Sequence, residues 1–149
     1  MFGPPGHAYV YLIYGYHFCI NAVCCPAGTA EAVLIRAVEP EFGREFLLRQ
    51  RPTKPEHLTN GPAKLCQAMA IDRGLDGADL CQLGSALAIA ENPALAEFRE
   101  RKGPVVTTTR IGITQAATLP LRFYLAGSPF VSRRARTQAP AGKARVRPG

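Results

Sequence analysis

The 149-residue sequence predicts an α+β fold, a single domain built around a curved, mostly antiparallel sheet from which an aromatic β-hairpin protrudes. Segments rich in β-branched and aromatic residues gather near the two ends of the chain, and segments with helical spacing of apolar residues lie between them. Hydrophobic residues make up 47% of the chain, which is enough for the core of one folded domain of this length.

The strand pattern is clearest over residues 8–23, where Tyr, Val, Ile and Phe predominate. Gly15 interrupts this segment, which predicts two strands joined by a tight turn at residues 14–16. Tyr9 and Tyr11 then point to the same side of their strand. A Tyr at the tip of the hairpin would be exposed, and exposed aromatic rings suit stacking on nucleic-acid bases. The alternative is that these rings simply fill one face of a sheet.

The remaining elements follow in order along the chain. A second turn is expected at residues 25–28, and a strand from Ala32 to Val38 that ends at Glu39-Pro40. Residues 41–51 have the apolar spacing of a helix. The other expected elements are a helix from Pro62 through Arg73 and strands at residues 86–90, 105–113 and 121–125.

The segment Asn60-Gly61-Pro62-Ala63-Lys64 opens the second predicted helix. Thr59 or Asn60 can cap this helix, and Pro62 suits its first turn because the missing N–H has no partner there. A helix start with a close glycine and a nearby lysine, here Gly61 and Lys64, is also suited to holding a phosphate. An ordinary capped helix is the alternative.

Arg36 stands in the middle of a predicted apolar strand. A buried arginine is costly unless it is paired or turned toward a site. Arg36 is therefore either a functional residue or one half of a structural ion pair with a distant acid.

The charge is distributed unevenly. Residues 1–100 carry eight Lys or Arg and all eleven acidic residues, whereas residues 101–149 carry ten Lys or Arg and no acid. We expect residues 1–132 to form the domain and residues 133–149 to form a basic, disordered tail. Such a tail suits a polyanion such as nucleic acid, or is simply solvated.

The five cysteines include no C-x-x-C pair, and none of the three histidines stands at ligand spacing from them. The sequence therefore predicts neither a disulfide framework nor a metal site. No apolar run reaches the roughly 18 residues of a membrane span, and no signal-peptide pattern opens the chain. We expect a cytoplasmic protein with no membrane partner.

Five segments occur in the order found in one enzyme family. They are MFGPPGHAYVYLIYG (1–15), VLIRAVEP (33–40), NGPAKLCQA (60–68), RIGI (110–113) and LRFY followed by GSPFVS (121–132). Over residues 1 to about 132 the chain thus resembles the alkyladenine (3-methyladenine) DNA glycosylases.

The resemblance implies a monofunctional enzyme of base-excision repair that acts without a metal or cofactor. Its substrates would be alkylated or deaminated purines in double-stranded DNA, including 3-methyladenine, 7-methylguanine, hypoxanthine and ethenoadenine. The resemblance further implies a monomer in the full-length form and an association with the nucleoid.

The family's site residues match positions of this chain. Tyr14, beside Gly15 at the hairpin tip, corresponds to the wedge that fills the gap left by a flipped nucleotide. Tyr11 corresponds to the residue that stacks on the extruded base, Asn21 to the residue that discriminates against the amino group of guanine, and Arg36 to a residue that helps hold the attacking water. The resemblance also marks Tyr16, His17 and Ile111 in the base pocket and Asn60, Gly61 and Lys64 as DNA contacts.

The chemistry also requires a general base. The family supplies it from a Glu in an E-x-E-A-Y motif, which this sequence lacks, and nothing moves that role to Glu31, Glu39 or Glu41. In the family the motif precedes the segment matched by Met1, so we expect that the chain starts late. Three readings stay open: a DNA glycosylase described by an incomplete chain, a catalytically inactive DNA-binding fragment, or an unrelated basic RNA-binding domain.

Overall fold

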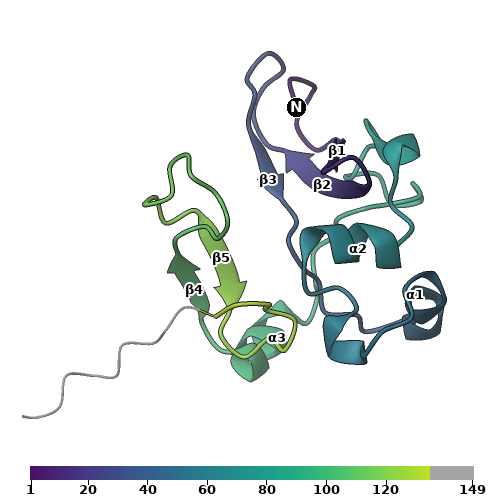
Figure 1. Ribbon diagram of the computed structural model, residues 1–149, viewed down its shortest axis with the longest axis vertical. Helices are drawn as coiled ribbons and strands as arrows, with labels where there is room; N and C mark the ends of the chain where they lie inside the picture. The colour runs from purple at the N-terminus through teal and green to yellow at the C-terminus, as the bar shows by residue number, and fades with distance from the viewer. Residues whose placement is uncertain (135–149) are drawn as a thin grey trace, which may run out of the picture.

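The computed structural model describes residues 1–134 (Figure 1). It contains helices and antiparallel strand pairs, which confirms the predicted α+β class. The strands form a three-stranded sheet and a separate two-stranded sheet. The predicted tail at residues 133–149 lies almost entirely outside the described residues.

The three-stranded sheet contains the predicted hairpin. β1 (Ala8–Ile13) pairs with β2 (His17–Val23), and β2 pairs with β3 (Ala32–Leu34). Tyr14 and Gly15 turn the chain between β1 and β2 with φ angles of 55° and 79°. Gly15 adopts this left-handed conformation without steric cost, whereas Tyr14 does so with strain.

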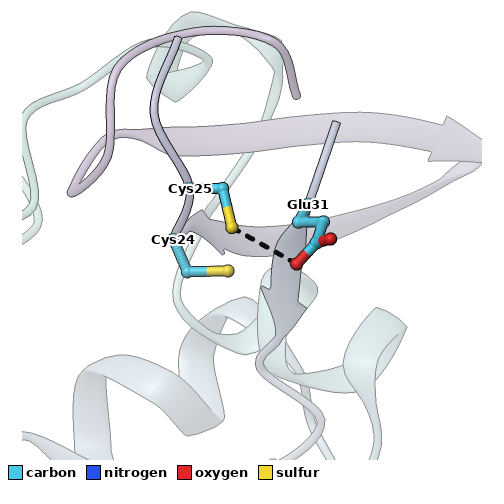
Figure 2. A group of neighbouring side chains, drawn as sticks. All are labelled: Cys24, Cys25 and Glu31. Atoms are coloured by element: carbon cyan, nitrogen blue, oxygen red, sulfur yellow. Dashed lines mark hydrogen bonds between the residues drawn. The ribbon is translucent and has the colours of Figure 1, made fainter. Parts of the chain in front are cut away.

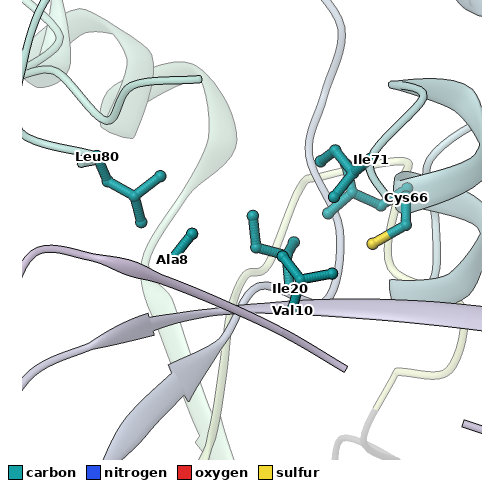
Figure 3. Close-up of a cluster of buried hydrophobic side chains, with 7 residues drawn as sticks. Ala8, Val10, Ile20, Cys66, Ile71 and Leu80 are labelled. Atoms are coloured by element: carbon teal, nitrogen blue, oxygen red, sulfur yellow. The ribbon is translucent and has the colours of Figure 1, made fainter. Parts of the chain in front are cut away.

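One face of this sheet carries the hydrophobic core (Figure 3). The sheet packs there against α2 (Pro62–Ala68) and the segment that follows it. Because strand residues alternate between faces, Tyr9 and Tyr11 face the opposite side. The buried core residues are Ala8, Val10, Ile20, Leu65, Cys66, Ile71 and Leu80.

The second group of elements consists of α3 (Leu95–Lys102) and the antiparallel pair β4 (Val105–Thr108) and β5 (Arg122–Leu125). Figure 1 shows this group beside the three-stranded sheet and its helices. The backbone N–H of Gly127 donates a 2.7 Å hydrogen bond to the carbonyl of Lys102, so the segment after β5 is held against the end of α3.

Three strand predictions were wrong in extent or existence. β3 ends at Leu34 rather than Val38, and β4 ends at Thr108 rather than Ile113. β4 stops opposite Arg122, where its partner β5 begins, whereas β3 stops although Ile35 still donates a backbone hydrogen bond to β2 at the Ile20 carbonyl. Residues 86–90 form no strand and run as a bend followed by irregular structure.

The helices also differ in part from the prediction. α1 (Arg44–Gln50) lies inside the expected segment. α2 begins at Pro62 as predicted, but it ends at Ala68 because Ala70 takes a positive φ of 53°. The sequence did not predict α3, none of whose residues is buried. Two short 3-10 helices, η1 and η2, occupy Pro55–His57 and Arg73–Leu75.

In residues 1–134, no helix has both the length and the apolar character of a membrane span.

Candidate functional site

A groove of about 1720 Å³ is lined by residues from both groups of elements. Tyr11, Asn21 and Arg36 come from the three-stranded sheet and the segment after it, and Arg110 and Arg122 come from the β4–β5 region. The groove therefore brings together five of the predicted site residues, because Asn60 and Gly61 also line it.

The sheet contributes an aromatic and polar surface to the groove. Tyr9 and Tyr11 lie on one face with their ring centroids 5.4 Å apart, as the strand alternation predicted. Asn21 pairs with Tyr9 across the strands, and its Nδ2 donates a 3.1 Å hydrogen bond to the Tyr9 carbonyl. This bond fixes the orientation of the Asn21 amide in the groove.

The Tyr11 hydroxyl and the Cys19 thiol on this face stay neutral at neutral pH. Burial raises the pKa of the Tyr11 hydroxyl, and Cys19 and Tyr9 raise it further, whereas the positive charge of Arg36 lowers it. Burial also raises the pKa of the Cys19 thiol, which lies opposite Tyr11 in the sheet. The face thus presents neutral groups beside one cation.

Arg36 follows the last ladder contact of β3 with β2. The backbone N–H of Ile35 donates a 3.1 Å hydrogen bond to the carbonyl of Ile20, and Arg36 is the next residue. The ion pairs formed within residues 1–134 are Glu39–Lys102 and Arg73–Asp76. The structural ion pair considered for Arg36 is therefore not present there, and its charge faces the groove.

Two further arginines add positive charge to the groove. Arg122 is 7% exposed, and its guanidinium carbon lies 4.6 Å from the centre of the Tyr124 ring. Burial lowers the pKa of Arg122, Tyr124 raises it, and the like charge of Arg36 lowers it. Arg110 Nη2 donates a 2.9 Å hydrogen bond to the Gln115 carbonyl, while its buried Nε lacks a partner among the described residues. Several guanidinium groups facing one concave surface favour an anionic ligand.

Three carboxylates also line the groove, at Glu31, Glu39 and Glu41. The Glu39 Oε1 lies 2.6 Å from the Lys102 Nζ, so this carboxylate is held in an ion pair. The Glu31 Oε2 accepts a 3.2 Å hydrogen bond from the Cys25 thiol. Two of the three carboxylates are therefore already engaged with neighbouring side chains.

The hairpin tip lies outside the set of groove residues. Tyr14 is 78% exposed and Tyr16 is 73% exposed, as predicted for aromatic residues at a tip. The Tyr16 ring contacts the His17 ring, with 4.2 Å between their centroids. The structure thus separates the predicted site into a groove and a protruding tip that carries Tyr14, Gly15, Tyr16 and His17.

The predicted helix cap was wrong. The N-cap of α2 is Gly61, with no side-chain cap, and Thr59 instead donates a 2.6 Å hydrogen bond to the Val38 carbonyl. Asn60 accepts a 2.9 Å hydrogen bond from the Lys64 Nζ through its Oδ1. Asn60 and Gly61 line the groove, whereas Lys64 is not one of the residues that line it.

The sequence analysis did not single out Arg110 or Arg122 as site residues. Each lies in a motif quoted for the resemblance, and Arg122, like Arg36, interrupts an apolar segment. An arginine inside an apolar segment is the sequence signal that could have identified Arg122 as a site residue. Ile111, which was predicted, does not line the groove itself, although its neighbours Arg110 and Ile113 do.

The chain is similar to known proteins over most of its length. A family model described as "Methylpurine-DNA glycosylase (MPG)" matches residues 1–129. Proteins named "Putative 3-methyladenine DNA glycosylase" from Methanoculleus marisnigri and Carboxydothermus hydrogenoformans are each 49% identical over 135 residues, which cover 90% of this chain and 68% of theirs. One from Rhizobium meliloti is 45% identical, over 90% of this chain and 66% of its own. The chain thus spans about two thirds of the length of these relatives and belongs to the methylpurine-DNA glycosylase family.

Proposed function

We propose that this chain acts as a DNA N-glycosylase that flips alkylated or deaminated purines out of duplex DNA and excises them in base-excision repair. The lesion classes are 3-methyladenine, 7-methylguanine, hypoxanthine and ethenoadenine, and the partner is double-stranded DNA that contains one of them. The observation that carries the proposal is one hairpin with two functional parts: an exposed Tyr14 at its tip and Tyr11 with Asn21 on its groove face.

The tip supplies the wedge. Tyr14 lies beyond the last strand pair, Ile13 with His17, so its ring projects from the molecule. Unstacking a base costs a few kcal/mol, and an aromatic ring inserted into the vacated space offsets part of this cost. A tip residue that contributes little to the core is suited to this role.

The groove supplies the pocket for the flipped base. The Tyr11 ring provides a stacking surface worth roughly 1–3 kcal/mol per base. The oriented amide of Asn21 discriminates by hydrogen bonding at the edge of the base, where guanine differs from adenine by its exocyclic amino group. The three groove arginines attract the phosphates that flank the extruded nucleotide.

Excision is a hydrolysis at the sugar. Water attacks the anomeric carbon while the glycosidic bond breaks, the purine leaves with the bonding electrons, and a base takes the proton of the water. Arg36 positions this water, but a guanidinium cannot accept the proton. The proton therefore requires a carboxylate.

The engagement of Glu31 and Glu39 favours a second candidate function. In it the chain binds and distorts damaged DNA without cutting it, because these two carboxylates are not free to take the proton and the third groove carboxylate, Glu41, does not serve in their place. The two functions share the wedge and the pocket and differ only in the chemical step.

A single-turnover assay with the 149-residue chain tests both functions. The substrate is a duplex with one hypoxanthine or ethenoadenine, and alkali cleavage at the abasic product reports excision. Cutting that is lost in Glu31→Gln, Glu39→Gln or Glu41→Gln supports the first function and identifies the base. Preferential binding of the lesion duplex without cutting supports the second. Equal binding of damaged and undamaged duplexes contradicts both.

A further inference from the structure

The connection between β2 and β3 brings two cysteines and a glutamate together. Cys24 and Cys25 directly follow β2, the chain turns over residues 26–29, and Glu31 directly precedes β3. The backbone N–H of Cys24 donates a 3.3 Å hydrogen bond to the Glu31 carbonyl. The three side chains therefore project from facing ends of two adjacent strands (Figure 2).

Their ligand atoms form a compact set. The two Sγ atoms and a Glu31 carboxylate oxygen all lie within 4.8 Å of one another. Both cysteines are free thiols. Cys24 and Glu31 are exposed and Cys25 is half-buried, so an ion can reach the set from solvent.

We propose that Cys24, Cys25 and Glu31 bind a thiophilic divalent cation, for which Zn²⁺ is the best fit. Zn²⁺ takes thiolate and carboxylate ligands at about 2.0–2.3 Å in a tetrahedral arrangement. Three protein ligands would leave its fourth position to water. Ca²⁺ and Mg²⁺ fit poorly, because they prefer sites made of oxygen ligands.

The cluster already holds a contact between two of the proposed ligands, because the Cys25 thiol donates a 3.2 Å hydrogen bond to the Glu31 Oε2. Binding of the cation breaks two S–H bonds, forms two metal–sulfur bonds and releases both protons to the solvent. The carboxylate that accepts the thiol hydrogen bond then becomes an oxygen ligand.

The cysteine spacing alone predicted no metal site, because it contains no C-x-x-C pair and no nearby histidine. Cysteine and histidine spacing takes no account of a carboxylate ligand. The third ligand is Glu31, which the turn between β2 and β3 returns to the cysteine pair.

The test uses the full 149-residue chain, reduced and freed of metal with a chelator. Titration with Co²⁺ reports thiolate ligation through charge-transfer absorption in the near ultraviolet, and Zn²⁺ is then added as a competitor. We expect one Co²⁺ per chain and displacement by Zn²⁺. Cys24→Ser and Cys25→Ser should each remove about half of the charge-transfer intensity, and Glu31→Gln should weaken binding at least tenfold.

Cys81→Ser is the matched control, because Cys81 is an exposed free thiol outside the cluster. It should leave the titration unchanged. The mutated cluster residues lie at the surface, and circular dichroism verifies that each variant is folded. The proposal is overturned by absence of the charge-transfer band, by a band that keeps its full intensity in Cys24→Ser or in Cys25→Ser, by one that depends on Cys81, or by full affinity in Glu31→Gln.

Discussion

The Lys102 Nζ lies 2.6 Å from the Glu39 Oε1 and joins the last turn of α3 to the segment that follows β3. The two side chains are only 18% and 19% exposed. The second carboxylate oxygen of Glu39 is buried and has no hydrogen-bond partner among residues 1–134. Lys102 therefore balances a carboxylate that water cannot fully solvate.

Lys102→Met should lower the free energy of unfolding by about 3 kcal/mol, because it leaves the buried Glu39 carboxylate without its cation. Urea titration measures this change. Arg73→Met is the control: its pair with Asp76 spans 3.9 Å and is largely exposed, so the change should stay below about 0.5 kcal/mol. The double variant Lys102→Met/Glu39→Gln should recover much of the loss. If Lys102→Met and Arg73→Met lowered the free energy of unfolding by the same small amount, Lys102 would not be balancing a buried charge.

Tyr14→Ala should reduce the preference for damaged over undamaged duplex by about tenfold, since it removes the proposed wedge. Fluorescence anisotropy with an ethenoadenine duplex measures this preference. The thermal midpoint should not change, because the side chain is 78% exposed. Tyr16→Ala removes a neighbouring ring of similar exposure and should have a smaller effect. An unchanged preference in Tyr14→Ala would favour the RNA-binding reading.

Arg36→Met should leave the stability unchanged or slightly raised, because Arg36 has no ion pair in the described chain and shares the groove with the like charge of Arg122. The same variant should weaken lesion binding or excision at least tenfold. Arg36→Lys, which keeps the charge but not the planar guanidinium, should give an intermediate result. A stability loss of about 2 kcal/mol or more would instead indicate a structural role.

Stability should fall as the pH rises from about 9 to about 11. Burial, followed by the nearby Cys19, raises the pKa of Cys66 from 9.0 to about 11. In this pH window the unfolded thiol has lost its proton while the folded one retains it, so the unfolded state binds fewer protons and is favoured by increasing pH. Urea titrations at pH 8 and pH 10.5 measure the effect. Cys66→Ala should show a smaller decrease, and an equal decrease in both proteins would contradict the assignment.

The hairpin could be predicted because its signals are local. Alternating apolar residues, Gly15 at the turn and the two tyrosines on one face all lie within 16 residues. α3 could not be predicted, because none of its side chains is buried and its sequence lacks an apolar stripe. The cap of α2 was mispredicted, because Asn60 turns its amide oxygen toward the Lys64 ammonium.

The candidate site was predictable residue by residue but not as an assembled surface. Tyr11, Asn21 and Arg36 were identified from their motif, and the structure places all three in the groove. The contribution of Arg110 and Arg122 depends on how the β4–β5 pair lies against the first sheet. No sequence spacing encodes that arrangement, because the contacts span about a hundred residues.

The alternation along β1 and β2 also bears on how this protein can change over evolutionary time. Val10 and Ile20 face the core, whereas Tyr11 and Asn21 face the groove, so substitutions on one face need not disturb the other. A single-residue insertion or deletion would exchange the two faces at once. We therefore expect natural variants to diversify here by replacement at groove-facing positions, with the length of the hairpin strands held constant.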